Sequence, residues 1–450
     1  MKKILSLAAP LIVSQLISMA LVLTDVWMMA QLSVSDLAGG GLGASVYTFV
    51  FLIAGSTVGC VANLIAIAYG QSVARPEYGL KQVRLAVKGA LMLAVLLTII
   101  LTTAFVFAPD FLRVAQQPEE VITVAMIYLD TLKWAMLPTL LLLILRGLTS
   151  NYGDAKSVMI MSLVTVILNV PFSYWLAFTL DWGIAGLGIG TALAATLVLI
   201  GYATWVFKRP AYYRFAPWLH LEEYNWRLML PLLSMGIPIA IAGALEMGLI
   251  YGGTLMAGFI GVTALALHQI LLQCLSFTWN INFGFSQAAA ILVGKEFGND
   301  NLIGVKAVAK RSFALVTILS AVLAVVFIVW PDAIASLFQL DGEGEHALTD
   351  MLSSLIWVVA LCFVVDAWQL LAINLLRGMK IVKLPTLMTA IGYWAFGLPA
   401  AWWLMERYEL AGIWGGILVG LAVTGLLLLA QLIVELRPSK TLRDNVVGVV

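Results

Sequence analysis

The chain alternates long apolar runs with short polar segments, and the lengths of these runs predict its architecture. A helix of about 20 apolar residues crosses the hydrocarbon core of a membrane at a rise of about 1.5 Å per residue. Runs of this length recur along all 450 residues. They predict twelve spans, at residues 6–31, 45–70, 86–109, 121–145, 157–180, 185–208, 230–258, 264–292, 309–338, 350–377, 384–405 and 411–436.

Composition supports a membrane protein. The chain is 62% hydrophobic and 11% charged, whereas soluble domains carry about 25% charged residues. We therefore expect an all-α polytopic membrane protein, with the lipid bilayer as one partner. A net charge of +1 and the absence of a basic patch give no reason to expect nucleic acid binding.

The basic residues predict how the chain is oriented. With the N-terminus inside, most lysines and arginines fall in cytoplasmic segments, as the positive-inside rule requires. Only Arg113 and Arg407 fall in outer loops, and Lys133 lies near the outer end of the fourth span. We therefore expect both termini to be cytoplasmic, in a bacterial inner (plasma) membrane.

The two halves of the sequence resemble each other at an offset close to 228 residues. Pro10 matches Pro238, and the pair Arg146 and Gly147 matches Arg377 and Gly378. Six spans per half insert both halves the same way up, which predicts two pseudo-symmetric six-helix bundles with a substrate path between them. The predicted domains are an N-terminal lobe at 1–208, a cytoplasmic linker at 209–229 and a C-terminal lobe at 230–450.

Three carboxylates lie deep in apolar runs without a basic residue within two helical turns: Asp25, Glu246 and Asp366. Each ionisable residue at such depth costs roughly 2.5–3.5 kcal/mol on insertion scales, so its presence needs a reason. Arg377 shares a helix face with Asp366, but it lies about 16 Å away along the helix. Asp130 is different, because Lys133, one turn on, can form a local ion pair with it.

Polar side chains accompany these acids. Ser14, Ser18 and Asp25 lie within about 40° of one another on a helical wheel, which predicts a polar stripe that faces the protein interior. Gln369 follows Asp366 by about one turn. His268, at the start of the eighth predicted span, can be an interface or capping residue or a functional one.

A buried carboxylate can act as a switch, because burial disfavours its charged form. Protonated, it is a neutral donor; ionised, it attracts Na⁺ or an organic cation. An ion-coupled transporter needs such a group. The alternative for any one of the acids is a permanently protonated hydrogen bond between helices.

Sequence signatures of enzymes are absent. The chain has no GxxxxGK[ST], HExxH or GxSxG motif and only three histidines. The glycine-rich "LAGGGLGAS" and "GIAGLGIG" are typical of close helix packing rather than of nucleotide loops. We expect neither enzymatic activity nor a cofactor, apart from a coupling ion, H⁺ or Na⁺.

Four segments, placed on these spans, resemble the multidrug and toxic compound extrusion (MATE) transporters of the NorM-like branch. They are "LTDVWMMAQLSVSDLAG", "LNVPFSYW", "ALEM" and "DAWQLLAINLLRG". The resemblance implies a V-shaped central cleft between the lobes. It implies that Asp25 is the protonation site of the N-terminal lobe, with Asn169 nearby. Glu246 and Asp366 would form the cation site of the C-terminal lobe, where Na⁺ can bind.

Two positions depart from the NorM-like pattern. Cys362 stands where a tyrosine is usual, and Ser173 stands where an asparagine is usual. Both departures weaken the implication of Na⁺ coupling and leave proton coupling open.

The favoured hypothesis is a secondary active multidrug efflux transporter that antiports H⁺ or Na⁺ against cationic amphipathic drugs and toxic organic compounds. We expect it to work as a monomer. The alternative is a flippase of lipid-linked precursors, whose anionic cargo would need arginines in the cavity. A membrane enzyme or a structural scaffold is the third class.

Overall fold

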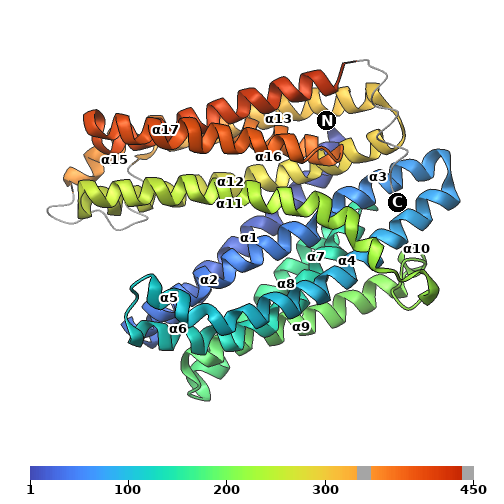
Figure 1. The fold of residues 1–450 in the computed structure, drawn as a ribbon, viewed down its shortest axis with the longest axis horizontal. Helices are drawn as coiled ribbons and strands as arrows, with labels where there is room; N and C mark the ends of the chain where they lie inside the picture. Colours follow the sequence, from blue (N-terminus) through green and yellow to red (C-terminus); the bar gives the residue numbers. More distant parts are fainter. Residues whose placement is uncertain (332–345, 438–450) are drawn as a thin grey trace. The chain divides into compact units, whose positions relative to one another are not determined.

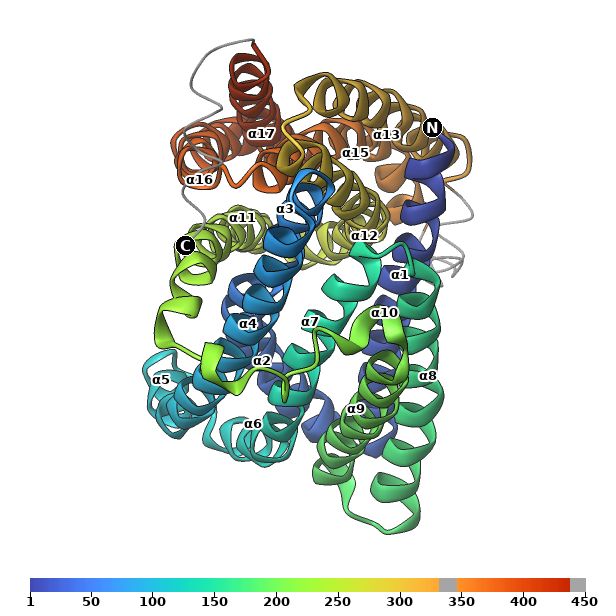
Figure 2. The same ribbon diagram turned by 90° about the vertical axis from the view of Figure 1, so that its right-hand side faces the viewer.

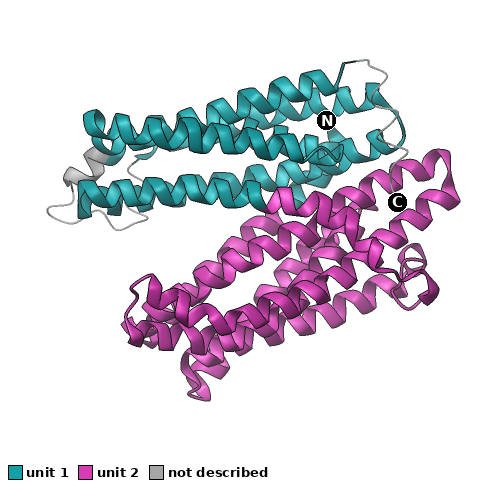
Figure 3. Ribbon diagram, in the orientation of Figure 1, with its two compact units in different colours: residues 1–12, 241–448 teal, residues 13–240, 449–450 magenta. Residues whose placement is uncertain are grey.

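The computed structural model describes residues 1–331 and 346–437, and within these ranges the secondary structure is helical, without strands (Figure 1). The chain divides into two compact units, coloured separately in Figure 3. One unit holds residues 13–240. The other holds Met1–Ile12 together with the described residues from Ile241 onward.

The first half of the chain contains nine major helices and several short ones. The helices are α1 (Lys2–Leu32), α2 (Val34–Gly59), α3 (Val61–Ala74), α4 (Pro76–Ala104), α5 (Ala108–Val114), α6 (Glu119–Leu132), α7 (Met136–Asn151), α8 (Ala155–Tyr174) and α9 (Gly183–Lys208). The short segments are η1 (Phe105–Phe107), η2 (Lys133–Ala135), the π-helical η3 (Trp175–Thr179), α10 (Pro210–Tyr213), η4 (Leu221–Glu223) and η5 (Trp226–Met229). Figure 2 shows α8 alongside α9, which it contacts.

The second half contains α11 (Leu230–Ile260), α12 (Val262–Gly298), α13 (Leu302–Val329), α15 (His346–Gly378), α16 (Lys383–Ala390), the π-helical η6 (Ile391–Gly397) and α17 (Leu398–Glu435). In this unit α15 packs against α12, α13 and α17. It is the most deeply buried of the apolar helices among the described residues. This central position matters because α15 carries Asp366 and Gln369.

The predicted number of spans agrees with the described residues, although the bounds of individual spans differ. Eleven helices of the described residues are long and apolar enough to cross a membrane, and the last, Lys383–Glu435, consists of two helices joined at a kink. Glu409 breaks it with non-helical backbone angles (φ 49°, ψ −126°). Gly412 and Gly416 then pack against the backbone of Leu404 and Ala401, so the chain doubles back on itself. The part of the predicted ninth span beyond residue 331 lies outside the described residues, as do Lys440 and Arg443.

The second predicted span begins earlier than expected, at Val34 rather than at residue 45. Ser33 caps this helix, since its hydroxyl accepts from the Asp36 amide at 2.9 Å, and such a cap satisfies one of the free donors at a helix start. The following glycines let α2 approach α6, with Gly39 against Val124 and Gly43 against Ala125. The glycine-rich segment is therefore a packing surface, as predicted.

The sequence repeat is also present in the packing. Gly147 at the end of α7 lies against Ala62 of α3, and Gly378 at the end of α15 lies against Ala290 of α12. Ala62 and Ala290 are separated by the repeat offset of 228 residues. Like α15, α7 packs against several helices of its unit, namely α2, α3, α4, α8 and α9. The two halves therefore use the same helix as a central support.

The boundaries of the compact units differ from the predicted domain ends. Residues 209–240, which include the predicted linker, belong with the N-terminal helices, and Met1–Ile12 belongs with the C-terminal helices. Both boundaries lie within a long helix, two residues after Pro10 in α1 and two residues after Pro238 in α11. A proline inside a helix removes a backbone hydrogen bond and weakens the helix at that point.

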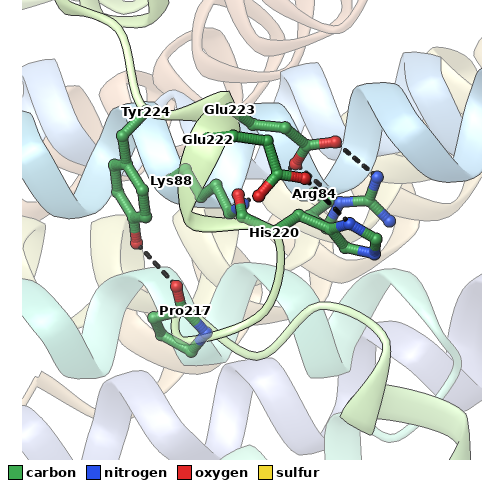
Figure 4. A network of polar contacts seen from close by, with 7 residues as sticks. All are labelled: Arg84, Lys88, Pro217, His220, Glu222, Glu223 and Tyr224. Atoms are coloured by element: carbon green, nitrogen blue, oxygen red, sulfur yellow. Dashed lines mark hydrogen bonds and ion pairs between the residues drawn. The ribbon is translucent and has the colours of Figure 1, made fainter.

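A network of charged residues anchors the linker to α4 (Figure 4). The Lys88 side chain is fully buried, and its Nζ donates to Glu223 Oε2 at 2.9 Å and to the His220 carbonyl at 2.6 Å. Arg84 Nε donates to the same carboxylate at 2.8 Å. Hydrogen bonds and charge from Arg84 and Lys88 lower the pKa of Glu223 to about 2. The linker is therefore fastened to the N-terminal helices.

We predict that Glu223→Gln destabilises the protein. The variant leaves Lys88 buried without its carboxylate, and hydrogen bonds to charged groups contribute about 1.5–3 kcal/mol. Its melting temperature in detergent at pH 7 should fall below that of the parent. Glu222→Gln is the matched control, because Glu222 is exposed and its ion pair among the described residues is with His220. A larger loss in the control would contradict the anchoring role.

The effect of Glu223→Gln should depend on pH. Because the folded-state pKa of Glu223 is depressed, its stabilisation is fully present above the ordinary carboxyl pKa of 4.5 and is lost as the pH falls toward 2. The difference in melting temperature between parent and variant should therefore shrink between pH 5 and pH 3. A constant difference over this interval would show that the charge of Glu223 is not responsible.

Candidate functional site

The C-terminal unit brings two of the three predicted acids together. Glu246 lies on α11 and Asp366 on α15, and the two carboxyl groups are close enough to interact electrostatically. Asp366 is 2% exposed, while Glu246 is partly exposed. Two carboxyl groups in a shared site cannot both ionise without a compensating positive charge. The pair is therefore suited to hold a proton or a cation.

Glu246 has two further neighbours, and the sequence predicted neither of them. Trp279 of α12 donates from Nε1 to Glu246 Oε1 at 3.1 Å. Arg377, near the end of α15, also interacts electrostatically with Glu246. The distance from Arg377 to Asp366 along α15 gave no hint of this contact, because Glu246 belongs to another helix. No basic residue lies within two turns of Glu246 on its own helix, as the sequence indicates, but α15 supplies a basic neighbour.

Several oxygens of the C-terminal unit are buried without a hydrogen-bond partner, and among them are Asp366 Oδ2, Gln369 Oε1 and the Tyr393 hydroxyl. Gln369 is 1% exposed, and Tyr393 of η6 is completely buried. Buried polar atoms in proteins are nearly always hydrogen-bonded. Tyr393 interacts with Gln369 and with Asp366, so these side chains form one polar group in the interior of the unit. Tyr393 was not predicted, since nothing in the local sequence connects it to α15.

The third acid, Asp25, lies in the other unit. It is partly exposed, but its Oδ1 is buried without a hydrogen-bond partner. Tyr128 of α6 is near enough to interact electrostatically with it. Met28 and Met29, on the next turn of α1, pack with Tyr128 in an apolar cluster. Asp25 therefore has an apolar and aromatic environment in which a neutral carboxyl group is favoured over a charged one.

The two serines of the predicted stripe have other partners than Asp25. Ser14 is buried and forms a hydrogen bond of 2.6 Å with Ser162 of α8. Ser18 donates to the Ser14 carbonyl at 3.0 Å. Ser14 thus faces the protein interior as predicted, and there it joins α1 to α8.

Asn169 and Ser173 lie on α8 and face α9. Asn169 Nδ2 donates to Thr191 Oγ1 at 2.9 Å, and its Oδ1 is buried without a partner. Ser173 packs closely against Gly190. No hydrogen bond joins Asn169 to Asp25 among the described residues. Their proximity, which the family resemblance implies, remains a prediction.

The remaining ionisable residues that the sequence singles out, Asp130, Lys133 and His268, have partners within the protein. Lys133 donates to Asp130 at 2.8 Å, and both side chains are partly exposed, which confirms the predicted local ion pair. His268 is fully buried, so it is not an interface residue. Its Nε2 lies 3.2 Å from Thr254 Oγ1, and its ring lies against Trp414. Over the described part of the chain no three His, Cys, Asp or Glu residues form a metal-binding group.

Comparison with known proteins shows the family. The MatE family model matches residues 10–175 and 238–403, two segments separated by the repeat offset. The chain belongs to the MATE family. It is a multi-pass membrane transporter, and the predicted fold class and family are thereby confirmed.

Among curated relatives, a "Probable multidrug resistance protein NorM" of Pseudomonas putida is 32% identical over 431 residues and covers 94% of this chain and 92% of its own length. One from Mesorhizobium japonicum is 30% identical over 434 residues and covers 95% and 92%. The solved structure of the eukaryotic MATE transporter AtDTX14 is 18% identical, with a TM-score of 0.87 over 100% of this chain and 98% of that one. A MOP superfamily transporter from Pyrococcus furiosus is 17% identical, with a TM-score of 0.87 over 98% and 96%. Both structures share the fold.

We predict that Ser14 and Ser162 stabilise the protein as a pair. Each alanine variant should lower the melting temperature, and the double-mutant cycle should give a coupling of about 0.6 kcal/mol, typical of hydrogen bonds between membrane helices. Ser18→Ala combined with Ser162→Ala is the control, because Ser18 bonds within its own helix. Purely additive effects of Ser14→Ala and Ser162→Ala would show that the 2.6 Å contact does not join the helices.

Proposed function

We propose that this chain is a secondary active multidrug efflux transporter, which antiports H⁺ or Na⁺ against cationic amphipathic compounds by alternating access. The membership of the family and the NorM relatives, named as probable multidrug resistance proteins, support the efflux of drugs. The main support for ion coupling comes from two carboxyl oxygens, Asp25 Oδ1 and Asp366 Oδ2, which are buried without a hydrogen-bond partner. An acid of this kind can take up and release a proton or a cation during each cycle.

The two units offer different chemistry. Asp25, with Tyr128 as its polar neighbour, has the surroundings of a simple protonation site. Glu246 and Asp366 share a site with Arg377. When both acids are ionised, the two negative charges and the one positive charge give this site a net charge of −1. Binding of one monovalent cation or one proton then neutralises it. A difference in ion binding between two conformations is the property through which a gradient drives transport.

The arginines bear on the alternative, a flippase for anionic lipid-linked precursors. Arg377 lies beside Glu246. Arg146 has the amide oxygen of Gln15 at 2.8 Å when that amide is oriented to satisfy its hydrogen bonds. Both side chains thus have partners within their own bundle. This favours efflux of cations over transport of an anionic lipid.

We predict that Asp25→Asn, Glu246→Gln and Asp366→Asn each reduce ion-driven efflux of a cationic dye from proteoliposomes. Initial rates should fall by about tenfold or more, because an amide cannot take up a proton or balance a cation as a carboxylate does. A pH gradient and a Na⁺ gradient are to be imposed separately, which identifies the coupling ion. Asp130→Asn is the control, since the ion pair of Asp130 in the described part of the chain is a local one with Lys133. Normal efflux by all three variants would falsify the coupling mechanism.

We propose that the protein resides in the bacterial inner membrane as a monomer with cytoplasmic termini. Cysteine labelling tests the orientation, because Cys60, Cys274 and Cys362 are all buried. Glu222→Cys, in the linker, should react with a membrane-impermeant maleimide only from the cytoplasmic side. Glu120→Cys, exposed at the start of α6, should react only from the outside. The reverse pattern would invert the proposed topology.

A further inference from the structure

Arg209, the residue that follows α9, has a guanidinium group in a fixed position. Its Cζ atom lies 3.6 Å from the ring centroid of Trp205, one helical turn earlier, so the group is stacked on the indole. Its Nη1 atom donates to Asp154 Oδ2, at the start of α8, at 2.9 Å. Trp205 is itself stacked on the buried ring of Tyr202, with the two centroids 5.6 Å apart. These contacts hold the guanidinium group against both α8 and α9.

The guanidinium group is nevertheless accessible and has N–H donors to spare. The Arg209 side chain is 47% exposed. A guanidinium group has five N–H donors in a planar fork, and the contact with Asp154 occupies Nη1. Ordering a long side chain at a surface costs entropy, and here stacking on Trp205 has already ordered it. A stacked arginine with free donors is well suited to bind a phosphate group.

Two lysines lie at the same end of the two helices. Lys156 is in the first turn of α8 and Lys208 is the last residue of α9, and both are exposed. The ion pair between Arg209 and Asp154 joins these two helix ends. Three positive charges and one negative charge give the four residues a net charge of +2. Between residues 157 and 207 the sequence has no basic residue, so the positive charge of this helical hairpin is confined to one end.

An exposed apolar stripe extends from this end along each helix. The helices pack side by side (Figure 2). The stripe on α8 follows Lys156 at helical spacing and consists of Ile160, Leu163, Val164 and Ile167. The stripe on α9 leads toward Lys208 and consists of Leu193, Leu197 and Ile200. Residues at these spacings share a helix face. In a membrane protein such faces contact the acyl chains of lipids.

The stacked arginine is not a general feature of the repeat. At the offset of 228 residues Arg209 corresponds to Arg437, and Trp205 corresponds to Ile433. Both Arg437 and Ile433 are exposed. The second half thus has an arginine at the equivalent helix end but no aromatic ring one turn before it. The indole therefore serves a purpose that is local to the end of α9.

We propose that this end of α8 and α9 binds an anionic phospholipid of the adjacent leaflet. The lipid phosphate accepts from the N–H groups of Arg209 that Asp154 leaves unoccupied, and Lys156 and Lys208 supply further positive charge. The acyl chains lie along the two apolar stripes. A zwitterionic headgroup is bound less tightly, because it carries a cation of its own. The site requires a membrane but does not depend on the proposed transport function.

The test is the melting temperature of the purified full-length protein in neutral detergent during titration with dioleoylphosphatidylglycerol or dioleoylphosphatidylcholine. The two lipids have the same acyl chains, so a difference between them reports the headgroup. A lipid that binds only the folded state raises the melting temperature. Each basic residue near an anionic surface contributes about 1 kcal/mol, so half of the shift should need about tenfold less phosphatidylglycerol than phosphatidylcholine.

Variants assign this preference to the named side chains. Arg209→Lys keeps the charge but loses the stack and the planar fork, and it should need about fivefold more phosphatidylglycerol. Lys156→Gln should show a loss of about the same size. Asp154→Asn removes the ion pair of Arg209 but no lipid ligand, so it should bind phosphatidylglycerol at least as tightly as the parent. Arg437→Lys is the matched control and should leave the titration unchanged.

Four results would overturn the proposal. The first is a parent protein that does not distinguish the two lipids, and the second is a titration of Arg209→Lys equal to that of the parent. The third is an equal loss in Arg437→Lys, which would indicate a general effect of surface charge. The fourth is an equal loss in Asp154→Asn, because only the ion pair would then matter.

Inorganic phosphate is the remaining probe, since it shares the chemistry of the headgroup but has no acyl chain. Sodium phosphate should not reproduce the shift when its concentration equals that of the half-saturating phosphatidylglycerol. An equal shift with phosphate that Arg209→Lys abolishes would assign the site to a soluble anion and would refute the lipid site.

Discussion

A membrane interior has almost no capacity to solvate charge, and this constraint governs the whole structure. Every charged or polar group within a span must find a partner in the protein or serve a purpose that repays its burial. Most polar side chains of the described residues satisfy the first condition. Ser14 pairs with Ser162, Asn169 with Thr191, and Lys88 with Glu223. The exceptions include two of the three acids, since Asp25 Oδ1 and Asp366 Oδ2 are buried without a hydrogen-bond partner.

The same constraint explains why the two halves of the repeat differ. Their scaffold is shared: α7 and α15 are the central helices, and each carries, in its last two turns, an Arg-Gly pair whose glycine abuts an alanine of a neighbouring helix. Yet the position equivalent to Asp25 in the second half is Gly253, which lies among Ile413, Ile417 and His268. Packing tolerates only small residues at such close contacts, whereas charge can be placed wherever function requires it. Symmetry of the fold therefore does not extend to the chemistry.

Much of this could be predicted from the sequence, because the signals are local. Apolar runs of membrane length predicted the spans, and three acids without basic neighbours stood out against them. The composition of the C-terminal site could not be predicted in full. Arg377 lies on α15 but acts on Glu246 of α11, and Tyr393 reaches the site from a π-helical turn. Neither relation leaves a pattern along the chain.

The sequence by itself determined the helices, their number and the candidate acids, since these follow from the free energy of transferring residues into lipid, which depends on residue type. The tertiary structure decided which groups meet. It turned Ser14 into an interhelical contact, gave Glu246 a cationic neighbour and placed Tyr393 near Asp366 and Gln369. Such outcomes depend on how helices rotate and approach one another. Small residues such as Gly378 and Gly392 determine how closely the helices pack. The separation of two residues along the chain does not show which residues this packing brings together.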